Sequence, residues 1–280
     1  MELKEYENQF ETEETELLVL IQKDIGGAGV VGDYLWPSAT FMASINLSTG
    51  DFSDEPGLLE WWIKKEPKRR NWGFELNGMT IYHVRGRRRI DKMDGKNWSP
   101  KMSNRFLLLE VLESDVQNDK LEEIKEAYQK PMVIGDDKTG HFTLNRDYER
   151  YEGEIDWLGK NCDVRLELDE NRRETADSAL EVLRKLVEDL EQLSLKFCKF
   201  AAEKLVNLAN EWQSEYSDDE ESVESITQED FMKRIEISEL SISADGDMEI
   251  SYLDDDMFGG HWIVVYTNIS GELKDANIEG

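Results

Sequence analysis

The chain has few of the residues that build disulfide frameworks and histidine clusters. Among its 280 residues are two cysteines, three histidines and five prolines. The cysteines, Cys162 and Cys198, lie far apart and form no Cys-x-x-Cys spacing, which excludes a disulfide-stapled scaffold. The histidines His83, His141 and His261 are isolated from one another in sequence.

Long apolar runs are absent as well. The longest, such as Phe106–Leu109, are far shorter than the roughly 20 residues needed to span a bilayer. The first residues, Met1–Glu5, are acidic and lack the apolar core of a secretory signal. We therefore expect a soluble cytoplasmic protein.

Basic residues are scarce relative to acidic ones. There are 33 Lys and Arg against 62 Asp and Glu, a formal net charge of −29. This charge opposes binding to nucleic acid and to anionic membranes, and it favours a basic protein partner. The simpler alternative is that it only keeps the protein soluble. Residues 1–135 have a net charge of −6 and residues 136–280 of −23, a first indication of two modules.

Recognisable catalytic motifs are missing too. The chain has no G-x-S-x-G, no phosphate-binding P-loop and no H-E-x-x-H. Residues 27–32 match G-x-G-x-x-G after a predicted strand. A dinucleotide site would need a helix directly after the glycines, and Asp33–Pro37 is not a helix start. This segment is therefore interpreted as a flexible loop.

Two basic clusters stand out in the first half. The first lies beside Trp61, Trp62 and Trp72, a combination that can bind nucleic acid. Because the overall charge opposes that use, we expect both clusters to dock on the acidic second half of the chain. Their members are Lys64, Lys65, Lys68, Arg69 and Arg70, then Arg85, Arg87, Arg88, Arg89 and Lys92.

In the first half, apolar runs bounded by turn residues predict short strands. A helix is predicted after Ser53 or Asp54 and is ended by Pro67, and a second begins near Asn118 and is stopped by Pro131. The Gly135–Gly140 turn separates domain 1–135 from domain 136–280. The predicted strands cover Leu17–Ile21, Thr40–Leu47, Met79–Val84, Phe106–Leu112 and Met132–Ile134.

The second half begins with alternating apolar and polar residues, a pattern typical of a meander. Helical stripes follow at 179–190 and 197–212, with Ser194 as a possible break, and then an acidic linker, Ser214–Ser225. Thr227 is predicted to cap a short helix, and Asp245–Gly246 to turn a hairpin. The fold class is α+β with two modules, the C-terminal one an antiparallel sheet packed against a helical pair. Its predicted strands cover 142–145, 150–157, 163–168, 235–243, 248–253, 261–267 and 273–278.

The segment Asp254–His261 is the candidate site. Its three carboxylates, Asp254, Asp255 and Asp256, and the imidazole of His261 are ligand types for a divalent metal ion. The simpler interpretation is a tight acidic turn, because Asp and Gly are common turn residues and the distal Glu of a calcium loop is missing.

The second half also carries a family likeness. Tyr151–Gly159, Ala201–Trp212, Ile226–Phe231, Asp254–Ile263 and Ala276–Gly280 hold its motifs in order. The segment resembles a bacterial family catalogued as a domain of unknown function, number twenty-two sixty-two. The first half resembles the N-terminal domain often fused to it, through Thr80–Arg85, Arg105–Glu113 and Tyr128–Pro131. The resemblance implies a two-part bacterial protein and supplies no reaction, ligand or cofactor.

Two functions follow as hypotheses. The first is a non-enzymatic protein-interaction module, of the immunity or toxin-neutralising kind, with a basic protein partner and no cofactor. The alternative is a metal-dependent hydrolase that uses Asp254, Asp255, Asp256 and His261, with one metal position open to water.

Overall fold

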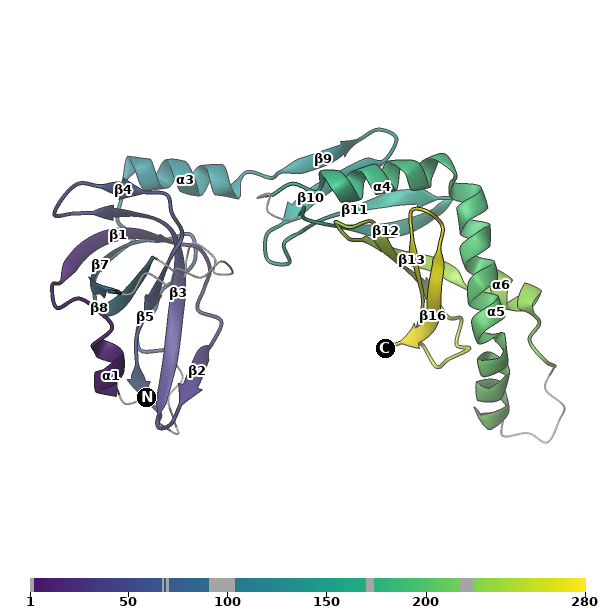
Figure 1. Cartoon of the computed structure of the whole chain (residues 1–280), viewed down its shortest axis with the longest axis horizontal. Coiled ribbons are helices and arrows are strands. Elements are labelled where there is room, and N and C mark those ends of the chain that lie inside the picture. The colour runs from purple at the N-terminus through teal and green to yellow at the C-terminus, as the bar shows by residue number, and fades with distance from the viewer. Residues whose placement is uncertain (1–2, 67, 69–70, 91–103, 170–173, 217–223) are drawn as a thin grey trace. The chain divides into compact units, whose positions relative to one another are not determined.

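The computed structural model describes residues 3–66, 68, 71–90, 104–169, 174–216 and 224–280. The chain is an α+β protein of two compact units, Met1–Lys130 and Pro131–Gly280 (Figure 1). The sequence placed the boundary five residues later, at Gly135. The division falls earlier because Val133–Asp136 forms a strand, β9, that pairs with a strand of the second unit.

The first unit is built on strands that close on themselves. β1 pairs with both β3 and β7, and β7, β8, β5 and β3 complete the ring, so the sheet forms a small barrel. Only β5 and β8 pair in parallel within this ring. Closure removes the free edges that these strands would otherwise expose. The strands are β1 Thr15–Ile21, β2 Ala28–Val31, β3 Tyr34–Asn46, β4 Phe52–Ser53, β5 Gly57–Glu60, β6 Ile63–Lys64, β7 Ile81–Arg88 and β8 Arg105–Ser114.

The helix predicted after Ser53 is wrong. Three short strands, β4, β5 and β6, occupy this stretch and all pair with β3. Gly57 explains part of the difference, because it lies so close to β3 that an added Cβ would be 2.0 Å from the ring of Phe41. Pairing with β3 and β8 outweighs the local helical spacing of the apolar residues.

Other local predictions in this unit are confirmed. Helix α3 spans Asp119–Gln129, and the Asn118 side chain accepts a hydrogen bond from the backbone N–H of Leu121. The G-x-G-x-x-G segment is an exception, because it forms β2 and its turn, paired with β3, and the predicted flexible loop is wrong. No helix follows it, in agreement with the interpretation that it is not a dinucleotide site. A short helix, α1 Leu3–Glu7, precedes the barrel.

Two described residues of the predicted clusters, Arg85 and Lys65, have partners inside the first unit. Arg85 contacts Glu14, Glu16 and Glu110, and Lys65 donates to the carbonyl oxygen of Gly32 at 2.7 Å. The expected docking of the clusters on the second half of the chain stays a prediction. Of the predicted cluster residues, Arg69, Arg70 and Lys92 lie outside the described residues.

The second unit is one eight-stranded sheet in the order β16-β15-β14-β13-β12-β11-β10-β9. Neighbouring strands run antiparallel, as predicted, with the exception of β12 and β13, which are parallel. The parallel pair arises because three helices separate these two strands in sequence. The strands are β9 Val133–Asp136, β10 Gly140–Asn145, β11 Arg150–Trp157, β12 Lys160–Glu167, β13 Glu236–Ile242, β14 Asp247–Leu253, β15 Trp262–Asn268 and β16 Leu273–Glu279.

The helices pack on one face of this sheet, where Figure 1 shows α4 and α5. These helices are α4 Asp177–Glu188, α5 Leu190–Tyr216 and α6 Gln228–Arg234. Their apolar stripes join the inward side chains of the strands in one core. The break between α4 and α5 falls at Asp189. Ser194, expected there, is buried inside α5 and accepts a hydrogen bond from the indole N–H of Trp157 at 3.0 Å.

One helix cap and one hairpin turn in this region were predicted correctly. Thr227 accepts a hydrogen bond from the backbone N–H of Asp230 and donates its hydroxyl to that carboxylate. The Asp245–Gly246 turn joins β13 to β14. The acidic centre of the predicted linker, residues 217–223, lies outside the described residues.

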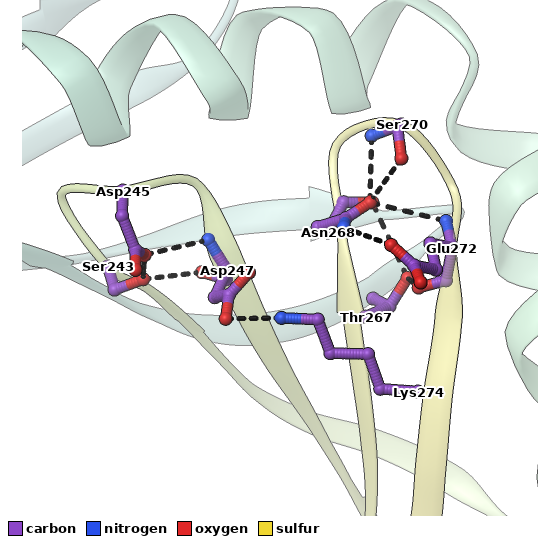
Figure 2. A network of polar contacts seen from close by, with 8 residues as sticks. All are labelled: Ser243, Asp245, Asp247, Thr267, Asn268, Ser270, Glu272 and Lys274. Carbon is purple, nitrogen blue, oxygen red and sulfur yellow. Dashed lines mark hydrogen bonds and ion pairs between the residues drawn. The ribbon is translucent and has the colours of Figure 1, made fainter.

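Two neighbouring hairpin turns are tied together at one end of the sheet (Figure 2). Asn268 accepts hydrogen bonds from Ser270 and from the backbone N–H of Glu272, which shapes the β15–β16 turn. Lys274, from β16, forms an ion pair with Asp247 at the start of β14. These contacts hold the register of the last three strands.

No helix in the described ranges is long and apolar enough to cross a membrane.

Candidate functional site

The predicted site, Asp254–His261, is the connection from β14 to β15. Asp254 is 4% exposed, and its carboxylate points into its own loop. One carboxylate oxygen accepts the backbone N–H groups of Phe258 at 2.7 Å and Gly260 at 3.1 Å, and the other accepts that of Asp256 at 3.3 Å. Asp254 therefore satisfies three backbone donors of its own loop, one of them buried, and shapes the loop.

The other predicted ligands have separate contacts. Asp255 is exposed and binds Arg234 of α6, whose Nε lies 2.7 Å from the carboxylate. The backbones of Asp255 and Asp256 have positive φ angles of 48° and 59°, which Asp tolerates in tight turns. The Nδ1 of His261 lies 2.6 Å from the carbonyl oxygen of Phe258, and its ring packs edge-on against Trp212.

The side chains of Asp254, Asp255 and His261 thus contact the loop itself or its neighbours. Within the part of the chain that the structure describes, no three His, Cys, Asp or Glu side chains are grouped to hold a metal ion. The geometry gives the predicted metal site no support, and the metal site stays a prediction that direct metal analysis must test.

The opposite face of the second sheet is a stronger candidate. Side chains of a strand alternate between faces, so those that do not enter the helix-covered core form a second, outer surface. We call this surface the outer face and define it by three rows of paired residues that cross the strands. The first row is Glu236, Leu253, Trp262, Glu279; the second Glu154, Asp163, Glu239, Ser251, Val264, Asn277; the third Glu152, Arg165, Ser241, Glu249, Tyr266, Asp275.

The outer face is strongly acidic. Its three rows hold eight carboxylates and one basic side chain, Arg165. Three of the carboxylates, Glu152, Glu236 and Asp275, pair with cations from outside the rows. Glu154, Asp163 and Glu249 are exposed, and none of them has an ion-pair partner among the residues described. Carboxylates spaced across adjacent strands repel one another and together produce a negative potential.

One carboxylate lies below this surface. Glu239 is 7% exposed and forms an ion pair with Arg165 of the neighbouring strand. Burial raises the pKa of the Glu239 carboxyl, the nearby Asp163 adds to that rise, and the charges of Arg165 and Arg150 oppose it. The middle of the outer face therefore holds a largely buried ion pair, Arg165 with Glu239, with exposed carboxylates around it.

Comparison with known families assigns the second unit. Residues 136–278 match the family model of DUF2262, described as an uncharacterized protein conserved in bacteria. The chain belongs to this family. Residues 2–128 match a second domain of unknown function, DUF7021, and so confirm the expected N-terminal partner domain. A search of curated proteins found no significant match.

The DUF2262 domain contains the Asp254–His261 loop and all of the outer face but Glu279. Sequence reasoning singled out the loop and missed the face. Its acids are scattered singly along five strands, from Glu152 to Glu279, and gather only when the strands pair. The alternation of acidic and apolar residues in β11 was the available signal, since Glu152, Glu154 and Asp156 alternate with core residues.

Proposed function

We propose that this DUF2262 protein is a non-enzymatic protein-interaction module that binds a basic protein partner through the outer face of its second sheet. The observation that carries the proposal is the excess of eight carboxylates over one basic side chain on that face. A negative surface steers a positive partner and raises its association rate.

The distribution of charge supports the same function. Residues 136–280 carry 38 acidic and 15 basic side chains, whereas residues 1–135 carry 24 and 18. A basic toxin held against this face would have its cationic surface covered, which is the immunity-like role. We propose the cytoplasm as the compartment, where thiols such as Cys162 and Cys198 stay reduced.

The test is capture of partners from bacterial lysate with three baits. The first is the unmodified protein, and the second carries Glu154→Gln, Asp163→Asn and Glu249→Gln on the outer face. The third is a matched control with Glu188→Gln, Glu191→Gln and Glu203→Gln on exposed helix positions. Both altered baits lose three negative charges, so a difference in partner capture between them shows that the location of the charges matters and not only their number.

We expect a salt-sensitive partner on the unmodified and control baits and its loss from the outer-face bait. Affinity should fall steeply with ionic strength, because exposed charges are screened over about 10 Å at 0.1 M salt. Equal capture by both altered baits, or no salt-sensitive partner at all, would overturn the proposal.

A further inference from the structure

Leu253 and Trp262 form an exposed apolar pair in the first row of the outer face. They are cross-strand partners that close the two ends of the Asp254–His261 loop. Leu253 is 48% exposed and Trp262 is 39% exposed. Glu236 lies beside Leu253, and Glu279 lies beside Trp262, so the row runs acid, apolar, apolar, acid.

We infer that this row binds an extended basic segment of a partner protein, in which an apolar residue lies midway between two cationic residues four positions apart. The inference rests on the proposed function and specifies the partner's chemistry. The apolar residue packs on Leu253 and Trp262, and the two cations pair with Glu236 and Glu279.

The spacing follows from the geometry of strands. Glu236 on β13 and Glu279 on β16 are separated by three strand-to-strand steps, about 14 Å at roughly 4.8 Å each. An extended chain rises about 3.4 Å per residue, so its residues i and i+4 lie about 14 Å apart on one side. Residue i+2 points the same way and falls at the midpoint, over Leu253 and Trp262.

Charge decides which kind of partner covers the apolar pair. Phosphate backbones and anionic lipid surfaces would meet Glu236 and Glu279 with like charge. A second copy of the outer face would do the same. Tryptophan is a typical interface anchor, because it buries a large area with little loss of side-chain freedom. A cationic segment with a central apolar residue can pair its charges with Glu236 and Glu279 and pack its apolar residue on the apolar pair.

Glu236 and Glu279 have only weak contacts within the chain, so both can bind a cation of the partner protein. Glu236 contacts Lys160 at 2.9 Å with both side chains more than half exposed, and Glu279 accepts the hydroxyl hydrogen of Tyr266. Exposed ion pairs contribute about 0–1 kcal/mol, so an incoming cation can displace Lys160 from Glu236. The contact of Glu279 is with an uncharged hydroxyl, so its charge has no cationic partner among the described residues.

The probe is a capped peptide of order Thr-Lys-Thr-Leu-Thr-Lys-Thr, added to the ¹⁵N-labelled full-length chain. Binding is followed by nuclear magnetic resonance at the indole N–H of Trp262, which is assigned with Trp262→Phe. One control peptide has the same composition with adjacent lysines, and a second has threonine in place of leucine. We expect saturable shifts of the Trp262 signal and about tenfold weaker binding when leucine is removed.

Variants of the chain test the anchor. Leu253→Thr, which keeps a strand-forming residue, should weaken peptide binding, whereas Leu195→Gln at an exposed position of α5 (49% exposed) should not. Equal binding of the two lysine spacings, or a Trp262 signal that does not move, overturns this inference. If partner capture still depends on the outer face in that case, the proposed function stands. If capture fails as well, both are wrong.

Discussion

Arg105 donates two hydrogen bonds to the carboxylate of Glu60, which is fully buried in the first unit. Its Nε lies 2.8 Å from one oxygen of Glu60, and its Nη2 contacts the other. The indole N–H of Trp36 donates to the same carboxylate at 3.0 Å, and Arg89 lies 3.8 Å away. Burial of these charges is tolerated because the carboxylate has several donors.

Breaking this pair should destabilise the first unit. Arg105→Met leaves Glu60 buried with fewer donors, and we expect a loss of about 3–5 kcal/mol in the free energy of unfolding. The measurement is urea unfolding of the full chain. Lys160→Met, which breaks an exposed pair with Glu236, is the control and should cost less than about 1 kcal/mol. Similar losses for the two variants would contradict this account of Glu60.

The Asp254 carboxylate should be needed for loop structure. Asp254→Ala removes the acceptor of three backbone N–H groups, and we expect a loss of about 3 kcal/mol in the free energy of unfolding. Asp256→Asn should change stability little, because Asp256 is exposed and Asn tolerates its positive φ angle. A small effect of Asp254→Ala in urea unfolding would contradict the assignment.

Metal analysis tests the hydrolase alternative. Because Asp254 and Asp255 are committed to backbone donors and to Arg234, we expect no stoichiometric metal in the purified protein by plasma mass spectrometry. Divalent ions should leave its melting temperature unchanged. Stoichiometric metal that is lost in His261→Ala would reverse this expectation and favour the hydrolase.

Glu239 should make stability fall as pH rises. Its pKa in the folded protein lies above the ordinary value of 4.5, chiefly because it is buried. The folded state therefore binds this proton more tightly than the unfolded state does, and stability is lost as pH rises through the raised pKa. Glu239→Gln should gain stability relative to the unmodified chain above that pKa, and the gain should vanish toward pH 4. Unfolding measured from pH 4 to 8 checks this, and a constant difference would contradict it.

Both thiols should resist modification in the folded protein. Burial raises the pKa of Cys162 to about 12 and also raises that of Cys198. Since the thiolate is the reactive form, we expect little reaction with an aromatic disulfide reagent at pH 8. Two thiols per chain should react after denaturation. Rapid labelling of the native protein would show that the core around α5 opens readily.

Local sequence chemistry predicted many elements correctly. A helix begins at Asn118 and Thr227 caps a second one, as expected, and Asp245–Gly246 forms its hairpin turn. These features depend on residues within a few positions of one another. The helix predicted after Ser53 failed because long-range pairing with β3 and β8 overrode a local spacing.

The family, the α+β class and the two-part organisation could be predicted from the sequence because motifs, periodicity and charge are local properties of the chain. Tertiary structure alone decided that the barrel closes, that Asp254 turns inward, and that the acids of β11 to β16 share one face. Pairing register fixes those relations, and register joins residues as distant as Glu152 and Glu279. The Leu253–Trp262 pair has the same origin, since its two residues meet only across adjacent strands.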